Sequence, residues 1–307
     1  MENNIDNVAH LPEGRGVRRP LRRAAVLGAG VMGAQIAAHL ANASIPVTLF
    51  ELPGGGDDRS APARGAIKSL AKLKPAPLGT AGVEARILPA NYEDDLEQLA
   101  ECDLIIEAIA ERLDIKASLY ASLAPHVSKH AVLASNTSGL SINALADVLP
   151  ESIRSRFLGV HFFNPPRYMH LVELIPSRHT DAGIIDWLEP LLVSTLGKGV
   201  VIARDTPNFI GNRIGVFSLV ATMHHAVDLG IGFEVVDQIT GKPLGRPKSG
   251  TFRTADVVGL DTLGHVINTL RDNLDNDPWH RYYQTPDYIE QLVAAGALGQ
   301  KTRKGLY

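Results

Sequence analysis

A glycine-rich turn near the N-terminus constrains the fold of this chain more than any other feature. The sequence AAVLGAGVMG places Gly28, Gly30 and Gly33 in a G-x-G-x-x-G spacing, directly after an apolar strand and at the start of a helix. In that setting the first glycine makes a tight turn, the second admits a pyrophosphate, and the third brings helix and strand together. The helix N-terminus then attracts the anion. The turn predicts a dinucleotide-binding β-α-β unit, although a glycine-rich turn alone can be only a turn.

An acidic residue narrows the choice of dinucleotide. The next predicted strand, IPVTLFE, ends at Glu51. A carboxylate at this position accepts hydrogen bonds from an adenosine ribose and repels a 2'-phosphate. No arginine follows it immediately. We therefore predict NAD rather than NADP as the cofactor.

Strands and helices alternate over the first two thirds of the chain. Further strands are predicted at DLIIEAIA, AVLASN, RFLGVHFF, MHLVELI and GVVIA, and further helices at ARGAIKSLAKLK and around IKASLYASLAPHV. Such alternation is typical of a doubly wound sheet. We predict an α/β fold with a Rossmann-like, mostly parallel sheet over residues 22–205.

The pattern changes near Thr206-Pro207. The segment FIGNRIGVFSLVATMHHAVDLG shows no strand-like alternation, and Asn208 stands where it could cap a helix. We predict an all-helical C-terminal domain over residues 206–307. The polar residues 1–21 lack the apolar core of a signal peptide and are predicted to be a flexible leader.

Composition argues against several classes of partner. A net charge of -3 on 307 residues provides no field that would attract nucleic acid. No stretch approaches the roughly 18 apolar residues of a membrane span. Cys102 is the single cysteine, so no intrachain disulfide can form, and no paired-cysteine or H-E-x-x-H spacing suggests a metal. We expect a metal-free protein of the cytoplasm that binds no nucleic acid and has no membrane span.

An imidazole and a carboxylate stand in two apolar runs. In GVHFFNPPRYMHLVELI, a hairpin about Arg167 would set His161 opposite Glu173, with Cβ atoms roughly 5 Å apart. The carboxylate would orient the ring and raise its proton affinity, as a general base requires. A buried structural histidine beside a rim glutamate fits the same spacing. His170, His224 and His225 are weaker candidates, because the first falls in the loop and the others lie within a helix.

Short polar residues occur at two further places. The run SNTS, residues 135–138, ends a predicted strand, and Asn212 lies just past the predicted domain boundary. Such residues usually form turns. Contact with a ligand is the alternative for each of them.

Six motifs together resemble one family. GAGVMG, AIAE, SNTSGLSI, HFFNPPRYMHLVE, DTPNFIGNR and VVGLD occur in the order typical of the L-3-hydroxyacyl-CoA dehydrogenase family. KPAPL, NYEDDLE and RPKSGTFRTADVVGLD resemble most the dehydrogenase part of bacterial multifunctional fatty-acid oxidation proteins. The resemblance implies NAD-dependent oxidation of an L-3-hydroxyacyl-CoA in β-oxidation, an acyl-CoA substrate and a homodimer. It leaves open whether the chain stands alone or is part of a longer multifunctional protein with an enoyl-CoA hydratase domain.

The resemblance assigns roles to individual residues. His161 is the implied catalytic base and Glu173 its partner, while Ser138 and Asn212 would bind the reacting oxygen of the substrate. The positions matching cofactor contacts are Gly28, Gly30, Val31, Met32, Gly33, Glu51, Ala110, Glu111, Lys116, Ser138 and Asn164. Ser69 and Lys72 match a region that meets the CoA nucleotide.

The residues assigned to the CoA nucleotide match the family pattern less clearly than the other site residues do. Arg64, Lys68 and Lys72 fall four apart on a predicted helix and form one basic stripe, which could meet a CoA phosphate or simply face solvent. The loop LPGGGDDRSAPARG has no family pattern. The ending KTRKGLY also departs from the glycine-rich K-T-G-x-G-F-Y of the family.

The same residues are compatible with two other functions. One is an NAD-dependent dehydrogenase of another 3-hydroxy acid, such as a sugar acid. The other is a non-catalytic NAD-binding protein on the same fold.

Overall fold

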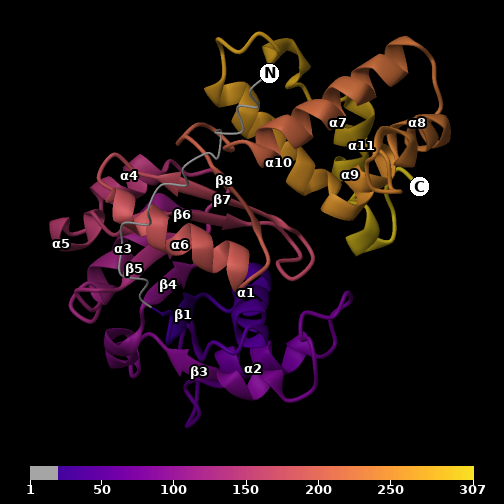
Figure 1. Ribbon diagram of the computed structural model, residues 1–307. Coiled ribbons are helices and arrows are strands. Elements are labelled where there is room, and N and C mark those ends of the chain that lie inside the picture. The colour runs from indigo at the N-terminus through magenta and orange to yellow at the C-terminus, as the bar shows by residue number, and fades with distance from the viewer. Residues whose placement is uncertain (1–19) are drawn as a thin grey trace, which may run out of the picture.

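Two regions of different architecture make up residues 20–307, which are the part of the chain that the computed structural model describes (Figure 1). The first is an eight-stranded sheet covered by helices, and the second is a helical bundle. This confirms the predicted α/β fold with a helical C-terminal region. The predicted leader falls almost entirely outside the described residues. No helix within residues 20–307 is long and apolar enough to cross a membrane.

The sheet has the strand order β3-β2-β1-β4-β5-β6-β7-β8. Neighbouring strands are parallel except for the antiparallel pair β6 and β7. The strands are β1 (Ala24–Leu27), β2 (Val47–Glu51), β3 (Ile87–Asn91), β4 (Leu104–Glu107), β5 (Val132–Ser135), β6 (Phe157–Phe162), β7 (Leu171–Pro176) and β8 (Gly199–Ile202). The strand order reverses between β1 and β4, so a crevice opens at their carboxyl ends, where ligands bind in such sheets.

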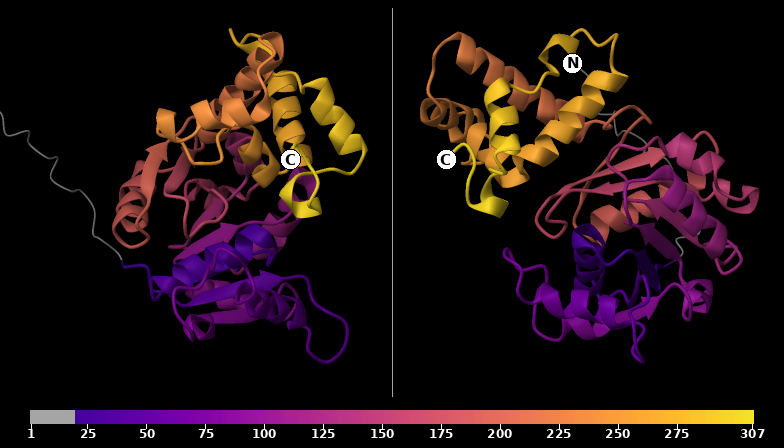
Figure 2. Two further views of the ribbon diagram at one scale, coloured as in Figure 1. Left: turned by 90° about the vertical axis from the view of Figure 1, so that its right-hand side faces the viewer. Right: turned by 180° about the vertical axis from the view of Figure 1, so that it is seen from behind.

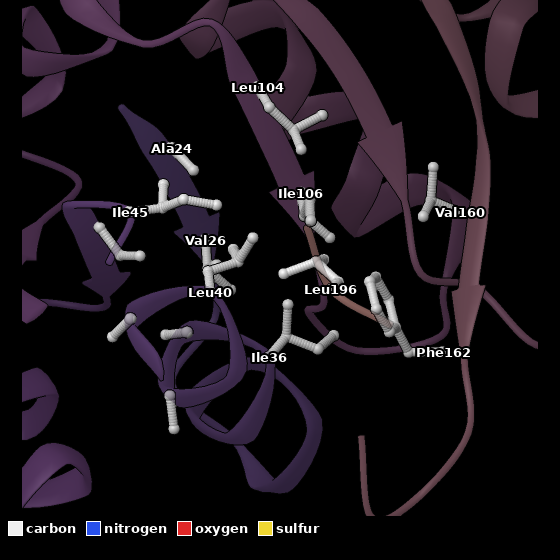
Figure 3. Close-up of a cluster of buried hydrophobic side chains, with 14 of the residues drawn as sticks. Ala24, Val26, Ile36, Leu40, Ile45, Leu104, Ile106, Val160, Phe162 and Leu196 are labelled. Atoms are coloured by element: carbon white, nitrogen blue, oxygen red, sulfur yellow. The ribbon is translucent and has the colours of Figure 1, made fainter. Parts of the chain in front are cut away.

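Two apolar cores sandwich the sheet. One lies under α1 (Val31–Asn42), α2 (Ala61–Leu70) and α6 (Ala182–Ser194), and Figure 3 shows its centre. The other lies under α3 (Leu113–Leu123), α4 (Ile142–Asp147) and α5 (Glu151–Arg154). Ala24 and Val26 of β1 belong to the first core and Ala25 and Leu27 to the second. The strand is therefore buried on both sides, as its continuous apolar sequence requires.

The second region has a core of its own. Its helices are α7 (Gly211–Asp228), α8 (Phe233–Thr240), α9 (Phe252–Val258), α10 (Leu260–Asn273) and α11 (Asp287–Ala294). Their buried residues, from Val216 to Ile289, form a separate cluster. The short 3-10 turns are η1 (Val83–Arg86), η2 (Leu96–Glu101), η3 (Lys242–Leu244), η4 (His280–Tyr282) and η5 (Gln300–Thr302). Figure 2 shows this bundle beside the β7 and β8 side of the sheet.

Two expected elements differ from the structure. Strand β3, with the sequence ILPAN, was not expected; it pairs only with β2 at the edge of the sheet, where Pro89 can be accommodated. Helix α2 ends at Leu70 rather than near Pro75. Lys72 therefore lies in the turn after the helix, so the predicted basic stripe is helical only at Arg64 and Lys68.

Candidate active site

Each of the three positions in the first turn requires glycine for a different geometric reason. Gly28 has a φ of +96°, and a Cβ there would lie 2.8 Å from the carbonyl oxygen of Ala108. A Cβ on Gly33 would lie 1.8 Å from the carbonyl oxygen of Gly28. A Cβ on Gly30 would meet no protein atom within 4 Å. The missing side chain at Gly30 thus opens space toward the crevice, as a bound pyrophosphate needs.

The surroundings of this turn also fit a dinucleotide. Helix α1 begins at Val31 without a side-chain cap, and Val31 is 69% exposed, so the N–H groups of the first turn face open space. Glu51 accepts the N–H of Ala29 at 2.7 Å and that of Leu52 at 2.8 Å. This fixes the carboxylate at the end of β2, beside the turn. The residues present therefore fit NAD.

His161 and Glu173 form a direct pair, as the hairpin predicts. They are opposite each other in the β6–β7 register, and His161 Nδ1 lies 2.7 Å from Glu173 Oε2. His161 is 5% exposed, and its ring packs against Phe163 at a centroid distance of 4.4 Å. Because the carboxylate can only accept, the ring carries its proton at Nδ1. Nε2 is then free to take a proton in the cleft.

The second oxygen of Glu173 caps helix α7. It accepts the N–H groups of Ile210 at 2.9 Å and Gly211 at 2.8 Å. Burial alone would raise the pKa of Glu173, but the hydrogen bonds from His161, Gly211 and Ile210 outweigh it and hold the pKa below its ordinary value. The expectation that Asn208 caps this helix is wrong, since its side-chain amide instead points to the carbonyl of Val266.

A cleft of about 400 Å³ brings these elements together. The helical region contributes Asn212 and Thr262, and the sheet region contributes the rest. Its lining residues are Val31, Met32, Ala108, Ile109, Glu111, Lys116, Asn136, Ser138, His161, Phe162, Phe163, Asn164, Asn212 and Thr262. The structure thus gathers in one cleft eight of the residues named from the resemblance.

Glu111 organises the loop that carries Ser138. Its Oε1 accepts the hydroxyl of Thr137 at 2.5 Å and the N–H groups of Ser138 at 2.9 Å and Gly139 at 3.1 Å. Burial favours a raised pKa for this carboxyl, but these hydrogen bonds and the nearby Lys116 lower it. Glu111 is therefore a carboxylate that holds the loop backbone in place.

The loop after His161 is held from two sides. The buried amine of Lys198 donates to the carbonyls of Pro166 and Met169, and burial lowers its pKa to about 8. Arg167 donates to the carbonyls of residues 76 and 78 at 2.8 Å. Asn164, also in this loop, receives a bond from Gln35 of α1 at 3.3 Å. The loop is thereby fixed beside the glycine turn.

The proposed CoA-side residues lie outside this cleft. Ser69 is exposed on α2 and donates to the carbonyl of Gly65, and Lys68 and Lys72 are exposed. Arg64 is paired with Asp58 at 3.0 Å. Ala110 is a neighbour of the lining residues Ile109 and Glu111 without lining the cleft itself.

The resemblance assigned no role to several of the lining residues. Asn136 belongs to the polar run of residues 135–138, and its side chain accepts the N–H of Phe162 at 2.9 Å. Phe163 lies two residues after His161, so the predicted strand RFLGVHFF already contained it. Thr262 carried no signal, because it reaches the cleft only through the packing of α10.

Glu173, Glu51 and the three glycines of the turn do not line the cleft themselves, but His161 and the first residues of α1 do. The parallel sheet, the glycine turn with its acidic neighbour, and a cleft-lining imidazole paired with a buried carboxylate define an NAD-dependent dehydrogenase. The family model for the NAD-binding domain of 3-hydroxyacyl-CoA dehydrogenase matches residues 23–206, and the model for the C-terminal domain matches residues 209–307. The chain belongs to the 3-hydroxyacyl-CoA dehydrogenase family. This confirms the family suggested by the six motifs.

Curated relatives agree with this placement. The chain is 42% identical to proteins named "Probable 3-hydroxyacyl-CoA dehydrogenase" from Bacillus subtilis and Deinococcus radiodurans, over 95% and 94% of its length. It is 37% identical over 95% of its length to a Rickettsia prowazekii protein named as a fatty acid oxidation complex trifunctional enzyme. The matches cover 39%, 82% and 41% of those relatives, respectively.

Solved structures share the whole architecture. A Mycobacterium tuberculosis protein, FadB2, is 33% identical, with a TM-score of 0.80 over 94% of this chain and 99% of that one. The (S)-3-hydroxybutyryl-CoA dehydrogenase of Ralstonia eutropha is 30% identical, with a TM-score of 0.76 over 94% of this chain and 99% of that one. The two-region fold is therefore that of the family.

Proposed function

We propose that this protein catalyses the reversible NAD-dependent oxidation of an L-3-hydroxyacyl-CoA to the 3-ketoacyl-CoA, as a step of fatty-acid β-oxidation. The observation that carries the proposal is that His161, which lines the cleft, lies 2.7 Å from the buried carboxylate of Glu173. A base with one nitrogen held by a carboxylate and the other facing the cleft is what removal of an alcohol proton requires.

His161 acts as the base in this mechanism. When bound, NAD+ supplies the acceptor for the hydride that leaves C3 of the substrate. Nε2 of His161 takes the proton of the 3-hydroxyl group, so the two electrons of the O–H bond form the carbonyl. Glu173 offsets the charge on the resulting imidazolium and keeps the ring oriented. In the reverse direction the imidazolium returns the proton to the oxygen.

Ser138 and Asn212 position the reacting oxygen. Both line the cleft, one from each region of the protein. Ser138 lies in the loop held by Glu111, and Asn212 follows the helix start held by Glu173. With both polar groups fixed before substrate arrives, the C3 hydrogen can be aimed at the nicotinamide without further ordering. Lys116, Asn164 and Met32 line the same cleft and are proposed cofactor contacts.

We propose that the CoA phosphates are bound by Lys68 and Lys72, with Ser69 as a further contact. Both lysines are exposed, and Arg64 is neutralised by Asp58. Lys68→Ala and Lys72→Ala should raise the KM for a CoA thioester, but not for the same acyl group on a short pantetheine thioester. Equal effects on both substrates would exclude a phosphate contact.

We propose a homodimer formed through the helical region. That region carries several exposed apolar residues: Ile214, Val227, Leu229, Val235, Ile239, Leu244, Val257 and Val258. Apolar surface is often covered at protein interfaces. Light scattering after gel filtration should give twice the mass of the chain, and Leu229→Asp should yield a monomer. A monomeric native protein would contradict the proposal.

We also propose that the chain works as part of a cytoplasmic multifunctional protein with an enoyl-CoA hydratase domain. Support comes from the Rickettsia relative, of which the chain spans 41%, and from the single, buried Cys102, which suits a reducing compartment. An enoyl-CoA hydratase makes the substrate of this reaction. The test is NADH formation from a 2-enoyl-CoA by the protein isolated from its native cells, with cell fractionation giving the compartment.

The decisive experiment is a steady-state assay of NADH consumption with 3-ketoacyl-CoAs of increasing chain length. We expect turnover with acetoacetyl-CoA or a longer homologue, and little with the free 3-keto acid. Preference for a free acid would indicate a dehydrogenase of another 3-hydroxy acid. No NADH oxidation with any of them would indicate a non-catalytic NAD-binding protein.

A further inference from the structure

A fully buried carboxylate lies behind the cleft, at the end of β4. Glu107 is 0% exposed and is absent from the cleft lining. Its Oε1 accepts Lys116 Nζ at 2.5 Å and the N–H of Ile109 at 2.8 Å. Its Oε2 accepts the hydroxyls of Tyr120 at 2.9 Å and Ser135 at 2.7 Å. A buried charge is tolerated only when its partners compensate for lost solvation, so these four donors fix the carboxylate in one position.

Lys116 connects this carboxylate to the cleft. It is 1% exposed, lies on α3 and contributes to the lining. Its Nζ also lies 3.5 Å from Oε2 of Glu111, whose other oxygen holds the N–H of Ser138. One ammonium is therefore shared unequally between two carboxylates, of which the more buried one takes the shorter contact. The farther one, Glu111, keeps its Oε1 for the loop.

We propose that Glu107 is a positioning residue that acts through Lys116 and Glu111 to hold Ser138 at the reacting oxygen of the substrate. The inference rests on the proposed function of Ser138. Interactions between charges are strong in such a dry environment. Without the charge of Glu107, the ammonium has Glu111 as its remaining carboxylate partner. It would draw Glu111 toward α3 and away from the backbone of Ser138.

A double-mutant cycle tests this relay. Glu107→Gln keeps the shape of the side chain and removes its charge, and Ser138→Ala removes the proposed contact to substrate. We expect Glu107→Gln to lower kcat for acetoacetyl-CoA by about tenfold in the native background, and by less than about twofold in the Ser138→Ala background, because residues in one network are not additive. A tenfold loss in both backgrounds would overturn the relay while leaving the proposed function intact.

Two controls separate positioning from general damage. Tyr120→Phe removes one hydrogen bond to Glu107 and keeps its charge, so it should give a smaller loss of kcat in the same direction. Thr240→Val removes a buried hydroxyl that pairs with Thr251 in the helical region. It should lower Tm without changing kcat. A kcat loss in Thr240→Val as large as that in Tyr120→Phe would overturn the proposal.

NADH binding supplies a readout that needs no turnover. The glycine turn and Glu51 are untouched by Glu107→Gln, so the Kd for NADH, measured by fluorescence titration, should change by less than about threefold. A loss of NADH affinity as large as the loss of kcat would mean a collapsed cleft and would overturn the relay. If Glu107→Gln does not fold, Tyr120→Phe takes its place in the cycle. Failure of the native protein to turn over any 3-ketoacyl-CoA would instead refute the proposed function.

Discussion

Glu173 hydrogen-bonds the backbone N–H of Gly211 at 2.8 Å while its other oxygen holds His161 at 2.7 Å. One carboxylate thus joins the sheet region to the first helix of the helical region. It fixes the proposed base and, through the start of α7, the proposed oxygen-binding Asn212. A change at this residue should therefore alter catalysis and stability together.

Replacing Glu173 should separate these two effects. Glu173→Gln keeps a carbonyl oxygen for the start of α7 but offers an amide to His161, whose Nδ1–H then lacks its acceptor. Turnover should fall, and the free energy of unfolding should fall only by the contribution of the lost charge. Glu173→Ala also removes the cap, which is worth about 1 kcal/mol, and should lower the free energy of unfolding further. Denaturant titrations of both variants provide the measurement, and equal stability losses would contradict the capping role.

The lowered pKa of Glu173 also predicts a pH dependence of stability. Because the pKa is lower in the folded protein than in the unfolded chain, this carboxylate stabilises the fold above its ordinary pKa of about 4.3. That contribution is lost as the pH falls through the folded value. Glu173→Gln cannot titrate, so the stability difference between native protein and variant should shrink on acidification from pH 7. A difference independent of pH would show that the carboxylate is not ionised in the fold.

His161→Gln should abolish proton transfer without disturbing the cofactor site. We expect turnover to fall by about 10²-fold or more, which is the usual contribution of a positioned base. NADH affinity should stay close to native, because the glycine turn and Glu51 do not depend on this ring. The rate should be measured by NADH consumption and the affinity by fluorescence titration. Near-native turnover would remove His161 from the mechanism.

Alanine substitutions at Gly33 and Gly30 should affect different properties, the first the stability of the fold and the second the binding of NADH. Gly33→Ala places a Cβ 1.8 Å from the carbonyl oxygen of Gly28, so it should destabilise the fold by about 1–3 kcal/mol. Gly30→Ala meets no protein atom within 4 Å, so Tm should change little while NADH binding weakens strongly. Undiminished NADH affinity in Gly30→Ala would place the pyrophosphate elsewhere.

The features that the sequence predicted correctly, one pairing of side chains and the sheet, follow from local patterns. The opposition of His161 and Glu173 follows from equal spacing about one turn, and the alternation of strands and helices predicts the sheet. The capping of α7 by Glu173 could not be found in this way, because Ile210 lies 37 residues further along the chain. Asn208, adjacent in sequence, was the natural expectation for the cap.

The network around Glu107 was missed for a related reason. Its donors come from three elements, with Lys116 and Tyr120 on α3, Ser135 on β5 and Ile109 after β4. In the sequence Glu107 ends an apolar strand, and nothing in the neighbouring residues indicates which groups donate hydrogen bonds to its carboxylate. Its position became interpretable only once the packing of α3 on the sheet was known.

We predict that Arg303, which replaces a glycine of the family's typical ending, lowers the stability of the protein. Arg303 adopts a φ of +54° at the end of η5, a left-handed conformation that disfavours residues with a Cβ. Arg303 is exposed and lies outside the cleft lining. We expect Arg303→Gly to stabilise the protein by about 0.5–1 kcal/mol, because glycine accepts this conformation without strain. Arg303→Ala retains the Cβ and should give no such gain, so it controls for the lost charge. Equal stability of the two variants in urea titrations would show that the backbone at this position is not strained.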